Sequence, residues 1–185
     1  MSSFMDLPAN LPIPVDDGAC DHLPGMPVPA IHLRATSGAL VDLAARPGRT
    51  VVYAYPRTGA PGEQAKPDWD MLPGARGCTP ESCGFRDHHA GLRELAAEVF
   101  GLSTQSTPFQ QEVVDRLHLP FSLLSDDGLQ MTRALRLPAF VYSGETLVKR
   151  LTLVIRDGVI EHVFYPVFPP DTHAEAVIAW LANTP

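Results

Sequence analysis

The residues best suited to chemistry lie in one stretch, GARGCTPESCGFRDHH, which runs from Gly74 to His89. This stretch holds two of the three cysteines of the chain, Cys78 and Cys83, with four residues between them. Thr79 and Pro80 follow the first cysteine, and Thr-Pro is typical of the cap and first position of a helix. Two thiols here can serve a metal site, a structural disulfide or a redox reaction, and their spacing bears on each.

A metal site and a permanent disulfide both fit this spacing poorly. Structural zinc usually takes a second cysteine pair further along the chain, and none follows here; a helix would also scatter Cys78, Cys83, His88 and His89 around its circumference. Five helical steps raise the chain by about 7.5 Å, beyond the roughly 7 Å between Cα atoms that an unstrained bridge allows. We therefore expect no bound metal, and a bridge that forms only when the helix start unwinds.

The remaining interpretation is a redox-active thiol pair. At a helix start, unpaired backbone N–H groups and the positive end of the helix dipole favour a thiolate and lower its pKa. A thiolate at Cys78 would be a nucleophile, and its product with a peroxide would be a sulfenic acid. Cys83 would then condense with that acid; the alternative is that Cys83 is only a small core residue.

Composition restricts the class of protein further. A length of 185 residues suits one domain, and a formal net charge of -7 argues against a nucleic-acid partner. No apolar run approaches the roughly 20 residues that a membrane span needs. The N-terminal segment has neither a basic leader nor an apolar signal core. We therefore expect a cytoplasmic protein, in which cysteines are more often free, catalytic or metal-bound than bridged.

Prolines divide the chain into parts. Six of them fall within residues 1–29, which excludes a regular helix and predicts an extended N-terminal arm. The folded domain would then cover residues 30–185. A second stretch rich in proline and glycine lies at residues 57–77.

Hydrophobic patterns predict alternating strands and helices along the domain. In chain order they are two short strands within 30–45, a strand at Thr50–Pro56, a helix from Thr79 to about Glu98, a strand in VFGLSTQ, a helix in TPFQQEVVDRLHL, a short strand in FSLLSDD, a short helix in DGLQMTRALRL, a hairpin with its turn at Asp157-Gly158, and a last helix capped by Asp171. Helices between strands imply parallel pairing, and the hairpin adds an antiparallel edge. The fold class is α/β: a thioredoxin-like fold with a mixed central sheet and helices on both faces.

Five motifs in this order resemble the peroxiredoxins of the bacterioferritin-comigratory, or Q-type, group. GCTPESCGFRD resembles that group's active-site segment, Thr-Pro-Gly-Cys-Thr-x-x-Ala-Cys-Gly-x-Arg-Asp. YAYP resembles the strand leading into the site, and VFGLSTQS, LPFSLLSDD and KRLTLVIRDGVIEHVF resemble the later strands and hairpin. Together the motifs cover residues 30–181.

The resemblance implies a peroxidase that reduces hydrogen peroxide or organic hydroperoxides without a cofactor. Its reductant would be a thioredoxin-like dithiol, and the protein would be a monomer or homodimer. Cys78 matches the peroxidatic cysteine, and Cys83 matches the resolving cysteine of an intramolecular disulfide. Arg150 matches the arginine that lowers the thiolate pKa and holds the peroxide. Glu81 matches a glutamate three residues after the reactive cysteine, and Pro56 matches the proline that shields the site.

The chain departs from the group's pattern in front of the reactive cysteine. Twenty-one residues separate Pro56 from Cys78, whereas the group's Pro-x-x-x-Thr-x-x-Cys motif has six, so the resemblance requires an insertion of 15 residues. Ala75 stands where the group has threonine. The hydroxyl that normally bonds the thiolate must then come from Thr58 or Thr79, or be missing.

Several alternatives stay open at this point. One is an exchange of roles between the cysteines, because Thr79-Pro80 precedes Cys83 much as Thr-Pro precedes the usual nucleophile; the alignment of Gly-Cys-Thr favours Cys78. A redox sensor or binding protein on the same fold is a second interpretation, motivated by Ala75. A thiol–disulfide oxidoreductase is a third, although it normally uses a Cys-x-x-Cys motif that this chain lacks. Cys20 is expected to be a bystander.

Overall fold

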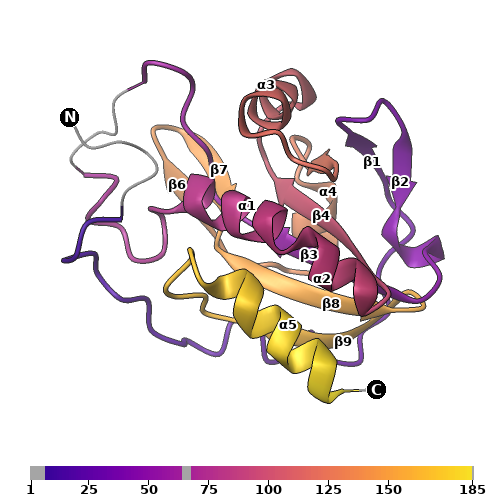
Figure 1. Ribbon diagram of the computed structural model, residues 1–185. Helices are drawn as coiled ribbons and strands as arrows, with labels where there is room; N and C mark the ends of the chain where they lie inside the picture. Colours follow the sequence, from indigo (N-terminus) through magenta and orange to yellow (C-terminus); the bar gives the residue numbers. More distant parts are fainter. Residues whose placement is uncertain (1–6, 64–67, 185) are drawn as a thin grey trace.

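The structure is a computed structural model that describes residues 7–63 and 68–184. Within these residues, a mixed sheet has the strand order β2-β1-β5-β4-β3-β8-β9 (Figure 1). Its strands are β1 (His32–Ala35), β2 (Leu40–Asp42), β3 (Arg49–Ala54), β4 (Ala97–Ser103), β5 (Leu123–Ser125), β8 (Leu151–Arg156) and β9 (Val159–Phe164). The central strand β3 pairs in parallel with β4 and antiparallel with β8. The predicted thioredoxin-like arrangement is confirmed.

Helices cover both faces of the sheet, but unequally. They are α1 (Cys78–Asp87), α2 (His89–Glu94), α3 (Thr107–Leu117), α4 (Gln130–Ala134) and α5 (His173–Asn183), with a 3₁₀ turn at Leu43–Ala45. Buried side chains of α1, α2, α3 and α5 form one core with Val51 and Tyr53 of β3. Figure 1 shows α1, α2 and α5 lying together across this face.

The other face is covered by α4 and by the N-terminal segment. Leu23 and Val28 of that segment are buried against the sheet together with Met131 of α4. The segment also hydrogen-bonds to the β8–β9 hairpin, where the N–H of Val28 donates to the carbonyl of Gly158 at 2.8 Å. The extended N-terminal segment thus covers apolar side chains of this face, as helices do on the opposite face.

One predicted helix ends earlier than expected. The helix expected to reach Glu98 breaks at His88 and ends at Glu94, and β4 begins at Ala97. Ala96 turns the chain with a left-handed φ of 55°. The prediction was wrong because pairing with β3, which starts at the register Arg49–Ala97, outweighs the helical propensity of Ala97 and Glu98.

A second difference is a small hairpin absent from the sequence expectations. Strands β6 (Ala139–Tyr142) and β7 (Glu145–Val148) form a separate two-stranded sheet. The stretch TLVKRLTLV, which precedes the predicted turn at Asp157-Gly158, therefore divides into β7 and β8, with Lys149 and Arg150 at the junction. The last helix is capped by Thr172, one residue after the expected Asp171.

Candidate active site

Strand register brings the predicted site residues to one end of the sheet. Ala54, the last residue of β3, pairs with Leu151, the first residue of β8. Pro56 lies two residues after β3, and Arg150 lies directly before β8. Both residues are therefore at the same end of the sheet. Pro56 is buried there. This pairing joins positions more than ninety residues apart in the chain.

The helix α1 delivers Cys78 to this end of the sheet. Gly77 caps the helix in a left-handed conformation with φ 105°, and Cys78 is the first helical residue. The expectation that Thr79 caps the helix is therefore wrong by two positions. Thr79 lies inside the first turn and is buried. Cys78 thus occupies the end of the helix where backbone N–H groups are not used by the helix itself.

The Cys78 sulfur is buried and contacts a guanidinium. Its residue is 3% exposed, and Nη2 of Arg150 donates to Sγ at 3.2 Å. Sγ lies 3.5 Å from the carbonyl oxygen of Ala75, to which it donates. The backbone N–H of Arg57 also donates toward the sulfur. The site therefore surrounds the sulfur with one cation and two backbone groups.

Arg150 is itself held rigidly. It is 3% exposed and forms an ion pair with the fully buried Glu81 through Nη1. Its remaining donors reach backbone carbonyls just before α1: Gly74 at 3.2 Å, Ala75 at 3.3 Å and Arg76 at 3.1 Å. A guanidinium with this many partners is oriented before any substrate arrives.

The pKa of Cys78 departs from the expectation. Burial raises the pKa of the thiol above its ordinary value, and this exceeds the opposing effect of Arg150. The nearby Glu81 also raises it. Arg150 therefore acts in the expected direction, but the closed site as a whole favours the protonated thiol. Burial likewise raises the pKa of Glu81 to about 7, against the pull of Arg150.

These two shifts predict a pH effect for Glu81→Gln. The substitution removes the negative charge that raises the Cys78 pKa, so Cys78 should form its thiolate at lower pH than in the unaltered protein. The ultraviolet absorbance of the thiolate, followed against pH and corrected with Cys78→Ser, measures this. Glu112→Gln on α3, an exposed carboxylate paired with Arg116, is the matched control and should leave the titration unchanged. A shift to higher pH would mean that Glu81 acts chiefly by positioning Arg150.

Cys83 lies one and a half turns further along α1. It is 6% exposed, belongs to the same core as Cys78, and both thiols are free. Burial raises its pKa, while Arg86 acts in the opposite direction. Arg86 is fixed by Asp87 and by the carbonyl of Leu117. Because α1 is continuous from Cys78 to Asp87, the two sulfurs cannot bond in this conformation.

One of the two candidate hydroxyls, that of Thr58, is bonded to another side chain rather than to the sulfur. Thr58 donates its hydroxyl to Oε1 of Gln105 at 3.2 Å, and the same oxygen accepts the Thr58 N–H at 3.0 Å. Ala75, in the position of the group's threonine, is buried in an apolar cluster with Trp69, Tyr142 and Leu147. In the described ranges, the hydrogen-bond partners of Sγ are Arg150 and backbone groups.

Part of the stretch before α1 packs onto the β6–β7 hairpin, through Trp69, Leu72 and Ala75. Trp69 is buried edge-on against Tyr142, with ring centroids 4.8 Å apart. The Tyr142 hydroxyl donates to Asp68 at 3.0 Å. Residues 64–67 lie outside the described ranges. The last residues of this stretch, Gly74, Ala75 and Arg76, direct their carbonyl groups toward Arg150.

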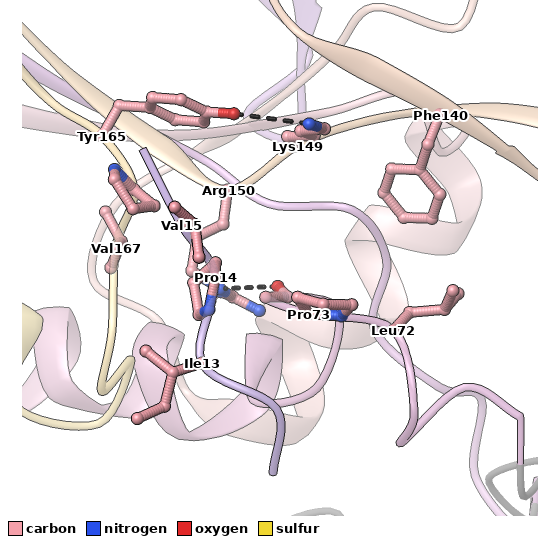
Figure 2. A pocket seen from close by; sticks show the side chains of 12 residues that line it. Ile13, Pro14, Val15, Leu72, Pro73, Phe140, Lys149, Arg150, Tyr165 and Val167 are labelled. Carbon is pink, nitrogen blue, oxygen red and sulfur yellow. Dashed lines mark hydrogen bonds between the residues drawn. The ribbon is translucent and has the colours of Figure 1, made fainter. Parts of the chain in front are cut away.

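A cavity of about 360 Å³ adjoins Arg150 (Figure 2). Its walls come from the N-terminal arm, the stretch before α1, the β6–β7 hairpin and the chain after β9. The lining residues are Ile13, Pro14, Val15, Leu72, Pro73, Gly74, Phe140, Lys149, Arg150, Tyr165, Pro166 and Val167. Figure 2 shows Pro14 directly in front of Arg150, with Phe140 and Leu72 across from Val167. Arg150 thus contacts both the cavity and the sulfur.

Sequence reasoning missed two parts of this site. The arm is extended, as its prolines predict, but nothing in its composition indicates that Pro14 lines a cavity together with Arg150. The second is His173 of α5, which the sequence analysis does not single out: it is buried, its ring lies 2.8 Å from the Thr152 hydroxyl, and burial lowers its pKa to about 3. Its inward position on an amphipathic helix was the one available signal.

Three comparisons place these features among known proteins. The family model described as Redoxin matches residues 23–178. Peroxiredoxin Q, chloroplastic, of Sedum lineare is 30% identical over 161 residues, which cover 86% of this chain and 77% of that protein. Peroxiredoxin Q, chloroplastic, of Oryza sativa subsp. japonica is 32% identical over 151 residues. That match covers 80% of this chain but only 62% of the rice protein.

Solved structures agree on the fold. The crystal structure of peroxidoxin BcpB from Mycobacterium tuberculosis has a TM-score of 0.71 and 27% identity, and covers 89% of this chain and 99% of that one. A Xanthomonas campestris peroxiredoxin Q structure has a TM-score of 0.66 and 21% identity, covering 94% and 98%. Among the described residues, no helix has the length and apolar character that a membrane span needs.

Proposed function

Because the chain belongs to the Redoxin family and, within it, to the peroxiredoxin Q group, we propose that it is a thiol-dependent peroxidase. Its substrates would be hydrogen peroxide or organic hydroperoxides. The observation that carries this proposal is the 3.2 Å contact between Nη2 of Arg150 and Sγ of Cys78 at the start of α1. A fixed cation at this place stabilises both a thiolate and the charge that develops on a departing oxygen.

The proposed first step is attack by the Cys78 thiolate on the distal peroxide oxygen. An S–O bond forms and the O–O bond breaks, so that the sulfur is oxidised to a sulfenic acid and the peroxide is reduced. The departing oxygen takes up a proton and leaves as water or an alcohol. Arg150 stabilises the anionic sulfur and this oxygen, while Glu81 keeps the guanidinium in place. Pro56 shields the sulfur, and Thr79 belongs to the turn that presents it.

The proposed second step joins the two cysteines. The Cys83 thiol attacks the Cys78 sulfenic sulfur and releases water, which requires the first turns of α1 to unwind. A thioredoxin-like dithiol then reduces the disulfide by thiol–disulfide exchange. This cycle needs no metal or organic cofactor. It needs a reducing compartment, for which we propose the cytoplasm, with the protein acting as a monomer or homodimer.

One equivalent of hydrogen peroxide tests this assignment. We expect Cys83→Ser to accumulate a sulfenic acid on Cys78, detected by mass spectrometry after trapping with dimedone. Cys78→Ser should be oxidised no faster than free cysteine. Cys20→Ser, which alters the third cysteine in the core of the opposite face, is the matched control and should behave like the unaltered protein. Sulfenic acid on Cys83 in the Cys78→Ser variant would contradict the assignment and exchange the two roles.

A second candidate function is a redox sensor with slow turnover. The burial that raises the Cys78 pKa, together with Ala75 in place of threonine, favours it. The two functions differ in rate. Stopped-flow oxidation that is fast, stoichiometric and dependent on Cys78 indicates the peroxidase, whereas oxidation near the rate of free cysteine indicates the sensor.

A further inference from the structure

The cavity beside Arg150 differs from the rest of the site in its chemistry. Most of its wall is carbon, contributed by residues such as Ile13, Val15, Leu72, Phe140 and Val167. Hydrogen peroxide has no group that would use such a wall. A volume of about 360 Å³ falls in the usual range for small-molecule sites, about 300–1,000 Å³.

Two segments build much of this wall: one precedes the range covered by the peroxiredoxin motifs, and the other lies between Pro56 and Cys78, where the resemblance requires an insertion. Ile13, Pro14 and Val15 belong to the N-terminal arm, and Leu72 and Pro73 belong to the stretch before α1. Ile13 is 68% exposed and Val15 is 82% exposed, so their carbon surface is largely open to solvent. A ligand with an apolar body would cover that surface and gain the corresponding hydrophobic free energy.

The charges at the cavity are already paired. Arg150 is neutralised by Glu81, and Nζ of Lys149 donates to Asp17 at 3.0 Å. Lys149 also lies 3.4 Å from the Tyr165 hydroxyl, which itself donates to Asp17 at 2.8 Å (Figure 2 shows the Lys149–Tyr165 contact). Among the residues that the structure describes at this cavity, Lys149 and Arg150 therefore both have an acidic partner already, and neither is free to pair with a carboxylate on the ligand. The chemistry of the cavity suits an uncharged tail.

We propose that this cavity is a tail-binding site that makes the protein selective for uncharged organic hydroperoxides with an aromatic or branched body. The tail lies between the arm and the stretch before α1, and the hydroperoxide group lies toward Arg150, the residue shared with Cys78. The proposal rests on the peroxidase function proposed above. It adds that arm residues determine which peroxide is preferred.

The test compares two substrates in one variant. Ile13→Ser/Val15→Ser changes two exposed side chains that belong to none of the buried cores, so folding should be preserved. We expect kcat/KM for cumene hydroperoxide to fall about tenfold, with kcat/KM for hydrogen peroxide unchanged. Leu40→Ser, an equally exposed apolar residue on the edge strand β2, is the control and should alter neither value. An equal fall for both peroxides, or no fall for cumene hydroperoxide, would overturn the proposal.

Binding without turnover separates this proposal from the peroxidase function. Cumyl alcohol, the unreactive product, should bind to the Cys78→Ser protein in calorimetry and bind about tenfold more weakly after Ile13→Ser/Val15→Ser. If cumyl alcohol binds in this way but the unaltered protein does not reduce peroxides, only the proposed peroxidase function is contradicted. If cumyl alcohol binds equally well with and without Ile13→Ser/Val15→Ser, only the proposed tail-binding site is contradicted.

The charge argument has its own measurement. A fatty-acid hydroperoxide should react more slowly than its methyl ester, and Asp17→Asn, which releases Lys149, should narrow that difference. A free acid that reacts as fast as its ester in the unaltered protein would overturn the selectivity for uncharged tails.

Discussion

Replacing Arg150 with methionine is expected to slow the oxidation of Cys78 by hydrogen peroxide about 10²–10³-fold. The guanidinium is the one side-chain cation bonded to Sγ in the described ranges, and Arg150 is held in place by Glu81 and three carbonyls. Methionine keeps the unbranched stem of the arginine side chain but has neither the charge nor the donors. Stopped-flow measurement of thiol loss under excess peroxide gives the second-order rate constant.

The same substitution should also destabilise the fold. Glu81 is fully buried, and without Arg150 it has no cation beside it, which should lower the free energy of unfolding by about 3–5 kcal/mol at pH 7. The Glu81 carboxyl would then fold protonated while the unfolded chain holds it ionised. As pH falls toward the unfolded value of about 4.3, both states become protonated and this part of the penalty disappears. Urea unfolding at pH 7 and pH 5 measures the difference.

A double variant separates the two effects of Arg150. Arg150→Met/Glu81→Gln removes the unpaired carboxylate. The double variant should therefore recover much of the stability that Arg150→Met loses, and the pH-dependent part of that loss should disappear. It should not recover the oxidation rate, because no cation faces the sulfur. Recovery of the rate would show that Arg150 acts only through the fold and would contradict its proposed role in the reaction.

Gly77→Ala is expected to lower the free energy of unfolding by about 2–3 kcal/mol. Gly77 has a φ of 105°, a conformation that residues with a Cβ rarely adopt. An added Cβ would overlap the Pro170 ring and would lie 3.1 Å from a Leu7 methyl group. Because Cys78 follows directly, relief of this crowding should also displace the sulfur from Arg150 and slow oxidation. Urea unfolding measures the loss of stability, and stopped-flow measurement of thiol loss measures the slower oxidation of Cys78.

Gly144→Ala provides the matched control for Gly77→Ala. Gly144 has a similar positive φ of 84°, but a Cβ added there meets nothing within 4 Å. It should therefore show the backbone cost without the crowding, and leave Cys78 oxidation unchanged. Equal effects of the two substitutions on stability would mean that contact with Pro170 contributes nothing.

The sequence was most informative where local patterns carry the structure. Alternating strands and helices predicted the sheet, and the Asp157-Gly158 turn predicted the β8–β9 hairpin, because these signals depend on neighbouring residues. The end of α2 was missed because Ala97 and Glu98 take their conformation from pairing with β3, which is a long-range contact. The β6–β7 hairpin was missed because its strands are short and lie in a separate sheet.

The candidate site, like the fold, was predicted only in part. The resemblance indicated Cys78, Glu81 and Arg150, and the structure brings these three together. It did not indicate how completely they are buried, and burial is what raises the Cys78 pKa despite Arg150. The cavity wall formed by Pro14 was also beyond the sequence, because the arm is positioned by contacts with distant segments.

The concealment of all three sulfurs has a chemical consequence beyond peroxide reduction. Cys20, Cys78 and Cys83 are 6%, 3% and 6% exposed. Exchange with a foreign disulfide requires a thiolate to approach the S–S bond along its axis, which a bulky molecule such as oxidised glutathione cannot arrange over a covered sulfur. Burial should therefore slow the formation of mixed disulfides on the reduced chain, and Cys78 and Cys83 should become accessible to such exchange only while the first turns of α1 are unwound.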